Sequence, residues 1–509
     1  MSGAFRRRSP GPVRAALCLA LAALPARAAL GAAANEGPSA PAAPPAFSDL
    51  VSVVHLHTTL SDGLATPLEM ARAARRAGVD ALVVTDHFLE RVEYAPWPLG
   101  NVMGIGMSRP SVMSNGIATY LRTLAAAEAE TGILVLPGIE VSPYARWSGS
   151  LLTRTLLLEG WHRHALVVGV EDPSALRGLP VAGNRAGGGY AAWSSVYLLP
   201  AAAFGWAVLR ALRPSYRETR MKNFVLRRRR APIGEVLLAS AALLVLVLGF
   251  PFKVEAYSPV ADDPGEAPFR LLVERVHDLG GFVAWAHPEA AAEKEVHGVR
   301  LATEPYGDLV VKTEADGFGA MPEGVKSLAP IGGLWDGALR DHVLGRRRTA
   351  PFALAELDEH RAIGEIDLVI LQTVLQVRAR THAGVLEAMR AGRMYGRWTP
   401  DRKTPLSLTA WSAGHGDASA VAGETLRCRG PVTLRLAVAG GDGAPVTARL
   451  VRGGSVIWSS RASPPFSSTV EDDATGGTSY RLDVEGAYPY RLISNPIFVV
   501  RPAGAEEGA

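Results

Sequence analysis

The sequence predicts an α/β fold in which βα units surround a parallel sheet or barrel. A transmembrane helical hairpin is expected to interrupt this part, and a small β-sandwich to follow it. Three observations predict this arrangement. Strand and helix patterns alternate on both sides of two uncharged apolar runs, a basic connector joins those runs, and short alternating strands begin near residue 404. The 509 residues suffice for two or three domains, and 48% hydrophobic content excludes a disordered or collagen-like chain.

Residues 1–28 are expected to be an export signal. They contain five arginines, no acidic residue and the apolar run AALCLALAALP, followed by small-residue sites such as Ala26-Arg27-Ala28. An uncleaved membrane anchor is the alternative. Residues 29–46 are rich in alanine, proline and glycine and are expected to be a linker. Cys18 and Cys428 are the only cysteines, which excludes a disulfide scaffold and a cysteine-ligated metal site.

Residues 47–403 are expected to form the barrel, and the strand and helix patterns follow one another along it. Apolar strand patterns and amphipathic helix patterns alternate before and after the uncharged runs. The expected strands are 49–57, 80–87, 133–142, 164–170 and 281–287, and the expected helices are 66–78, 117–132 and 269–280.

Two membrane helices are expected at 186–209 and 232–252, inside the barrel region. Residues 186–209 and 236–252 contain no charged side chain, and each run is long enough to cross about 30 Å of hydrocarbon at 1.5 Å per residue. Gly187, Gly188 and Gly189 are interpreted as a flexible approach to the first helix. The alternative is a pair of buried core helices, which the basic connector between them disfavours.

The connector at 213–230 is expected to be cytoplasmic. It contains eight basic residues against Glu218 alone, and the positive-inside rule places such a loop in the cytoplasm. Both helices then return the remaining chain to the periplasmic or extracellular side, where the export signal would also deliver it. Outside the connector and residues 1–28 the chain is net acidic, so the pI of 9.1 reflects topology and not a nucleic-acid surface.

Residues 404–502 are expected to form a small Ig-like β-sandwich. Short alternating apolar segments are separated there by glycine, proline and aspartate, over about 100 residues. These segments are VTLRLAVAG, VTARLVRGG, SVIWSS, SYRLDVEG and NPIFVV.

Histidines and carboxylates recur where the predicted strands end or begin. Side chains two apart on a strand project from the same face, as His55 and His57 do, and barrel active sites assemble from several strand ends. Imidazole and carboxylate ligands suit divalent ions such as Zn, Mn or Fe, and this many would hold two or three of them. The residues concerned are His55, His57, Asp62, His87, Glu140, His164, His287, Asp358 and His360.

Here the chain resembles the PHP (polymerase and histidinol phosphatase) superfamily of metal-dependent phosphoesterases. VHLHTTLSDG and ALVVTDH resemble its first two motifs, and PGIEVS, HALVVGV, AWAHPE and LDEH the later ones. The end of the barrel region and the phrase SNPIFVV also resemble a subgroup that includes carbaryl-hydrolase-type enzymes. The likeness covers roughly 50–185 and 255–500 and implies a distorted (β/α)₇ barrel with a metal cluster in its mouth.

Carried over position by position, the resemblance implies that the nine residues above are the metal ligands, with Glu140 bridging two ions. His162 is an alternative to His164. Asp62 and Asp86 are the expected catalytic carboxylates, with Asp86 as proton shuttle or as a residue that orients a ligand, or else in a plain turn role. The last motif departs from the usual Gly-Ser-Asp-x-His, because Leu357 replaces the small residue.

The resulting hypothesis is a membrane-tethered, exported metal-dependent hydrolase. A metal cluster lowers the pKa of bound water, so that hydroxide attacks a phosphoester, or a related carboxylester or carbamate. The alternative is a non-catalytic envelope protein that binds partners or serves as a scaffold on the same fold. The intact ligand set favours the enzyme, and the export signal argues against a nucleic-acid partner.

Overall fold

The computed structural model describes residues 47–94, 105–150, 152–296, 298–362, 367–400, 403–473 and 476–501. The expected export signal and linker, at 1–28 and 29–46, lie outside the described residues.

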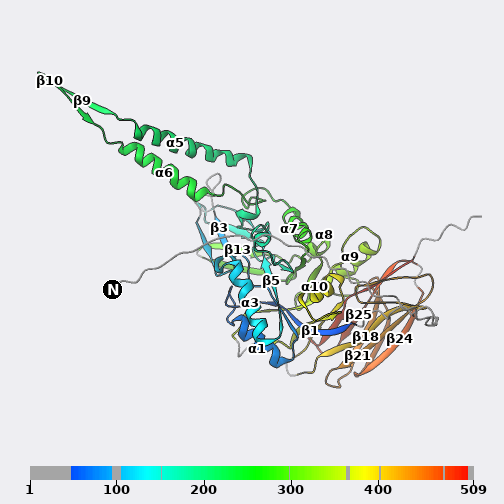
Figure 1. Cartoon of the computed structure of the whole chain (residues 1–509). Helices are drawn as coiled ribbons and strands as arrows, with labels where there is room; N and C mark the ends of the chain where they lie inside the picture. Colours follow the sequence, from blue (N-terminus) through cyan, green and yellow to red (C-terminus); the bar gives the residue numbers. More distant parts are fainter. Residues whose placement is uncertain are drawn as a thin grey trace, which may run out of the picture. The chain divides into compact units, whose positions relative to one another are not determined.

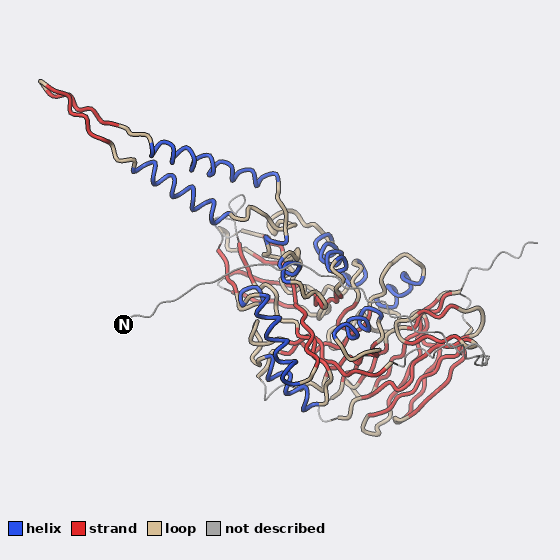
Figure 2. Tube along the Cα trace, viewed as in Figure 1, coloured by secondary structure: helices blue, strands red, loops and turns tan. Residues whose placement is uncertain are grey.

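Seven strands close into a barrel. Figures 1 and 2 show strands of this part of the chain with helices beside them. Neighbouring strands follow the chain order, and the last pairs back with the first. All neighbours run parallel except β8, which is antiparallel to both β5 and β11. The amino end of β8 therefore lies at the carboxyl ends of the other six strands. The strands are β1 (Ser48–Leu56), β2 (Ala81–Val84), β5 (Leu134–Val141), β8 (Ala165–Val168), β11 (Phe282–Trp285), β14 (Gly317–Met321) and β15 (Phe352–Glu359).

Helices cover the barrel, and the first shows why they form where they do. Helix α1 (Pro67–Ala77) begins with a capping box between Thr66 and Glu69 and ends at Gly78 in the left-handed conformation. Its buried face joins the main apolar core. The other helices of this part are α2 (Val112–Asn115), α3 (Ile117–Thr131), α4 (Pro173–Arg177), α7 (Ala267–Asp278), α8 (Asp308–Lys312), α9 (Leu334–Val343) and α10 (His382–Ala391).

Two small sheets accompany the barrel. One has four strands, in the order β12 (Ala292–Val296), β13 (Val299–Thr303), β7 (Leu157–Glu159) and β6 (Arg146–Ser148). The other is the hairpin of β3 (Arg91–Tyr94) and β4 (Ile105–Ser108). Side chains from both sheets line a pocket that also includes His87, Glu140 and His164.

Helices α5 (Leu198–Leu212) and α6 (Ile233–Gly249) pack against each other, and Figure 1 draws them side by side. A two-stranded ribbon of β9 (Tyr216–Met221) and β10 (Phe224–Arg229) joins them. Among the described residues, the helical stretch Ser194–Leu212 is long and apolar enough to cross a membrane, whereas Ile233–Gly249 is a shorter apolar helix.

The first of these helices differs from its predicted range of 186–209. Residues before Leu198 form two short 3-10 turns, Arg185–Gly187 and Ala192–Tyr197. Gly188 belongs to a close backbone contact, since a Cβ there would lie 1.7 Å from the carbonyl oxygen of Val254. Gly188 and Gly189 thus permit the chain before α5 to pair, as a strand would, with Val254 after α6. Residues paired in this way cannot belong to the predicted helix.

The C-terminal strands form two sheets that share one apolar core. One sheet has the order β19-β18-β21-β24. The other continues the barrel sheet, because β16 (Leu371–Val377) pairs with β1, and β17 (Met394–Trp398) pairs with β26. The sheet of the barrel therefore continues past residue 404, where the sequence predicts that a separate sandwich begins. The strands are β18 (Leu406–His415), β19 (Ala418–Val421), β20 (Thr425–Arg427), β21 (Val432–Gly440), β22 (Val446–Arg452), β23 (Ser455–Ala462), β24 (Phe466–Asp472), β25 (Thr478–Glu485), β26 (Arg491–Ser494) and β27 (Ile497–Val500).

Candidate metal centre

The structure brings all nine predicted ligands together at the carboxyl ends of the barrel strands. Four overlapping groups have ligand atoms within 4.8 Å of one another. His164 belongs there because β8 runs in the opposite direction and begins at this end of the barrel. The groups are His57, Asp62, His87 and His360; His162, His164 and His287; His55, His57 and Asp358; and His87, Glu140 and His164.

Three of these residues have an unusual backbone. His55, His287 and Asp358 have φ angles of 70°, 27° and 51°, a region that non-glycine residues rarely occupy. At His55 the pairing of β1 with both neighbouring strands shifts register between Val54 and Leu56. Such conformations cost about 1–3 kcal/mol each and gather at functional sites, where the surrounding structure maintains them.

Glu140 is the central carboxylate of the cluster. Its side chain is almost fully buried and lies 2.7 Å from His164 Nδ1 and 2.9 Å from His87 Nδ1. It also lies 3.2 Å from His55 Nε2 and 3.3 Å from His57 Nε2. Burial alone would raise the pKa of Glu140, but the surrounding histidines hold it well below its ordinary value. An ionised carboxylate therefore lies among imidazole nitrogens.

Several of these close atoms do not form hydrogen bonds with one another. The buried atoms His55 Nε2, His57 Nε2, His164 Nδ1 and Glu140 Oε2 have no hydrogen-bond partner among the described residues. Buried polar atoms normally have partners, so atoms that converge without one call for another group. Nitrogen and carboxylate oxygen are ligands that divalent ions accept. The residues present therefore fit a metal centre.

Two further carboxylates complete the ring of ligand atoms. Asp62 lies 3.3 Å from His57 Nδ1 and 3.4 Å from His360 Nε2. Asp358 lies 3.3 Å from His55 Nε2. The ring of His360 stacks on that of His57 with centroids 4.0 Å apart.

Neighbouring carboxylates raise the pKa of two buried histidines of the centre, His55 and His87. Burial disfavours the imidazolium of His55, but Asp358 and Glu140 outweigh that effect and raise its pKa to about 10. His87 is likewise buried, yet Glu140 and Asp62 raise its pKa to about 9. When no cation is bound, the protons on these imidazoles thus balance the negative charge of the neighbouring carboxylates. A metal ion needs neutral imidazole, so metal binding would release these protons.

His162 and His164 both face this centre, and the choice between them as ligand stays open. Burial lowers the pKa of His162 to about 3 and that of His164 to about 4. Both rings are therefore neutral, the form that coordinates metals. The His162 ring stacks on His287 with centroids 4.4 Å apart, whereas His164 contacts Glu140 directly.

Two residues that the sequence did not indicate support the ligands. Glu356 lies 3.2 Å from His55 Nδ1 and accepts a hydrogen bond from the backbone N–H of His287. Tyr306 lies 3.1 Å from His287 Nδ1 and accepts a hydrogen bond from the backbone N–H of His164. Partners on the outer ring nitrogen orient a histidine toward a metal. The only local feature of the sequence that could have indicated the role of Glu356 is its position two residues before Asp358.

Asp86 lies behind the first motif. Its carboxylate accepts hydrogen bonds from the Thr58 N–H at 2.7 Å and hydroxyl at 2.8 Å, and from the Ser61 hydroxyl at 2.5 Å. Burial raises the pKa of Asp86 above its ordinary value. These contacts hold the loop between His57 and Asp62. A proton-shuttle role for Asp86 stays a prediction.

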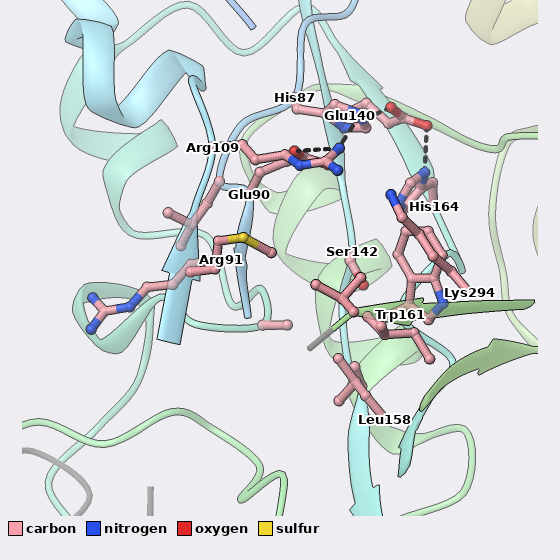
Figure 3. Close-up of a pocket in the computed structure, with 16 residues that line it drawn as sticks. His87, Glu90, Arg91, Arg109, Glu140, Ser142, Leu158, Trp161, His164 and Lys294 are labelled. Carbon is pink, nitrogen blue, oxygen red and sulfur yellow. Dashed lines mark ion pairs between the residues drawn. The ribbon is translucent and has the colours of Figure 1, made fainter. Parts of the chain in front are cut away.

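A pocket of about 110 Å³ adjoins the metal centre (Figure 3). His87, Glu140 and His164 form one side of it. Arg109 and Lys294, which the sequence did not single out, also line it. Arg91 lines the pocket too and pairs with Glu93 at 2.6 Å.

No protein-family model and no curated protein sequence match the chain. Among solved structures, a two-domain protein from Bacteroides vulgatus that contains a predicted PHP-like metal-dependent phosphoesterase is 12% identical. It has a TM-score of 0.33 and covers 86% of this chain and 90% of its own. A protein named as a metal-dependent phosphoesterase from Bifidobacterium adolescentis is 14% identical, with a TM-score of 0.26 over 62% of this chain and 89% of its own. An amidohydrolase from Chromobacterium violaceum, solved with sulfate and no metal, is 17% identical, with a TM-score of 0.25 over the same shares.

Proposed function

We propose that this protein is a metal-dependent hydrolase that acts on a phosphoester or a related ester, with carboxylesters and carbamates as the related classes. One observation carries the proposal: buried imidazole nitrogens surround the Glu140 carboxylate, and several of these nitrogens and one carboxylate oxygen have no hydrogen-bond partner among the described residues. The nine ligands would hold two or three divalent ions. When bound, such ions supply an activated water as nucleophile and stabilise negative charge on the group under attack.

The chain's own residues prepare the site for this chemistry. Glu140 and its histidines hold the cations, while Glu356 and Tyr306 fix the orientation of His55 and His287. The guanidinium of Arg109 and the ammonium of Lys294 line the adjoining pocket and attract an anionic substrate.

Two residues that could act as side-chain nucleophiles are poorly placed for that role. The Ser61 hydroxyl donates to Asp86, and Cys428 is buried in the core of the C-terminal strands. Their placement argues against a covalent intermediate on either residue.

The proposal predicts chelator-sensitive hydrolysis. The purified protein is expected to hydrolyse 4-nitrophenyl phosphate or bis(4-nitrophenyl) phosphate, to lose this activity with a chelator and to regain it with Mn²⁺ or Zn²⁺. A parallel panel of 4-nitrophenyl acetate and an aryl carbamate identifies the ester class. Hydrolysis that persists without metal would point to another nucleophile, and inactivity of the metal-loaded protein on every ester would favour the scaffold alternative.

We further propose that α5 and α6 anchor the enzyme in a membrane, with the catalytic part exported. Both helices carry exposed apolar side chains along their length, including Leu209 and Leu244 at 60% and 58% exposure. Helix α6 has 17 residues and spans about 25 Å, near the lower limit for crossing the hydrocarbon layer. The arginines of the β9–β10 ribbon would remain in the cytoplasm.

Reporter fusions test this topology. Alkaline phosphatase folds only after export, so a fusion after Ala290 is expected to be active and a fusion at Asn223, between β9 and β10, inactive. The reverse pattern would contradict export of the catalytic part. Activity of both fusions would contradict the membrane crossing.

A further inference from the structure

The wall of the pocket beside the candidate metal centre exposes more apolar than polar surface, although half of its sixteen side chains are polar or charged. It lies between the β3–β4 hairpin and the four-stranded small sheet, next to His164 and Glu140 (Figure 3). Leucine, methionine and valine side chains form much of its wall, namely Leu89, Met107, Leu158, Val296 and Leu301. Its volume of about 110 Å³ is comparable to an apolar cavity of about 150 Å³ that binds benzene, so it accepts a group of about one ring.

Two hydrogen-bonding groups in this wall have no partner. Trp161 Nε1 and the Ser142 hydroxyl are buried atoms without a hydrogen bond among the described residues. Figure 3 shows both residues beside His164 at the pocket. The indole N–H can only donate, so the group that satisfies it must bring an acceptor. Leaving a buried donor unpaired is unfavourable, and an acceptor-bearing ligand would remove that cost.

The positively charged side chain of a lysine lies at the same pocket. Lys294, on β12, lines it and makes no ion pair or hydrogen bond through its ammonium with any residue that the structure describes. The two arginines of the pocket differ in this respect, since Arg109 approaches Glu90 and Arg91 approaches Glu93. The positive charge of Lys294 is therefore available to an acceptor oxygen on a ligand.

We infer that this pocket is a subsite for the organic group of the substrate. It takes a largely apolar group of about one ring that carries acceptor oxygens, which Trp161, Ser142 and Lys294 recognise while the ester lies at the metal centre. This inference rests on the proposed function and deepens it, because it assigns the substrate class and three specificity-determining residues.

Binding of phosphonates to the metal-loaded protein tests the subsite without turnover, because their P–C bond is not hydrolysed. The probes are methylphosphonate, phenylphosphonate and 4-carboxyphenylphosphonate, measured by calorimetry. Phenylphosphonate is expected to bind at least about tenfold tighter than methylphosphonate, because its ring buries apolar surface. The 4-carboxyl group is expected to add about fivefold or more, because it pairs with charged and unpaired donors.

Trp161→Phe keeps an aromatic ring and removes the N–H. It is expected to lower affinity for 4-carboxyphenylphosphonate about fivefold and to leave methylphosphonate binding and metal content unchanged. Lys294→Met is expected to act in the same direction, and Trp458→Phe, in β23 of the C-terminal strands, serves as the control.

Each other outcome rejects a defined part of the account. An equal loss for all three phosphonates in Trp161→Phe would mean that Trp161 supports the metal centre and that no subsite exists. Equal affinity of the wild type for methyl and aryl phosphonates would reject the subsite while the proposed function stands. Failure of every phosphonate to bind would reject the phosphoester function together with the subsite.

Discussion

Glu140→Ala is expected to lower the hydrolytic rate by about 10³-fold or more. Glu140 contacts five imidazoles of the centre, so under the proposed function its removal would take a central carboxylate ligand from the cations that the site holds. A divalent ion contributes several kcal/mol of charge stabilisation to the transition state, and each 1.36 kcal/mol is worth about tenfold in rate. Glu140→Gln, which keeps the shape and removes the charge, is expected to lose nearly as much.

The measurement is the steady-state rate on the ester that the wild type hydrolyses best, with thermal unfolding recorded in parallel. His277→Ala is the matched control, because His277 pairs with Asp316 at 3.0 Å and belongs to none of the four ligand groups. Its activity is expected to stay within about twofold of wild type. Full activity of a folded Glu140→Ala protein would remove Glu140 from the metal centre.

Arg481→Ala is expected to destabilise the protein by about 3–5 kcal/mol. Arg481 on β25 and Asp336 on α9 form two hydrogen bonds of 2.8 and 2.7 Å, and both side chains are 2% exposed. The guanidinium also lies over the ring of Trp335. Removing one partner of a buried ion pair leaves an uncompensated charge, which accounts for a loss of this size.

A urea titration measures this loss. Arg449→Ala provides the comparison, because the Arg449–Glu485 pair is partly exposed to solvent and its removal is expected to cost less than about 1 kcal/mol. The double replacement Arg481→Met with Asp336→Leu is expected to recover much of the stability. A loss below about 1 kcal/mol for Arg481→Ala would show that the pair is not buried as described.

The barrel strands and the positions of the candidate ligands at their ends were predictable because their signals are local. Apolar strand patterns such as those around Val54 and Val83 are bounded by the residues that carry the chemistry, and carboxyl ends of parallel strands meet at one edge. The direction of β8 was not predictable, since a short apolar run reads the same in either orientation. The sequence nevertheless placed His164 in the ligand set, through its resemblance to a known motif.

The remaining features depend on contacts distant in sequence. Glu356 and Tyr306 support His55 and His287 from separate segments, and nothing beside Tyr306 in the sequence marks that role. The pairing of β17 with β26 and the Arg481–Asp336 ion pair likewise join residues about 100 or more positions apart. The non-helical backbone at Gly188 depended on its contact with Val254.

The metal content of the purified protein tests the central claim most directly. The full chain, purified without chelators or added metal and analysed by mass spectrometry of its elements, is expected to contain two or three divalent ions per chain. Glu140→Ala is expected to lose most of them, and His277→Ala to retain them. A metal content near zero in folded wild-type protein, unchanged after incubation with Mn²⁺ or Zn²⁺, would contradict the metal centre.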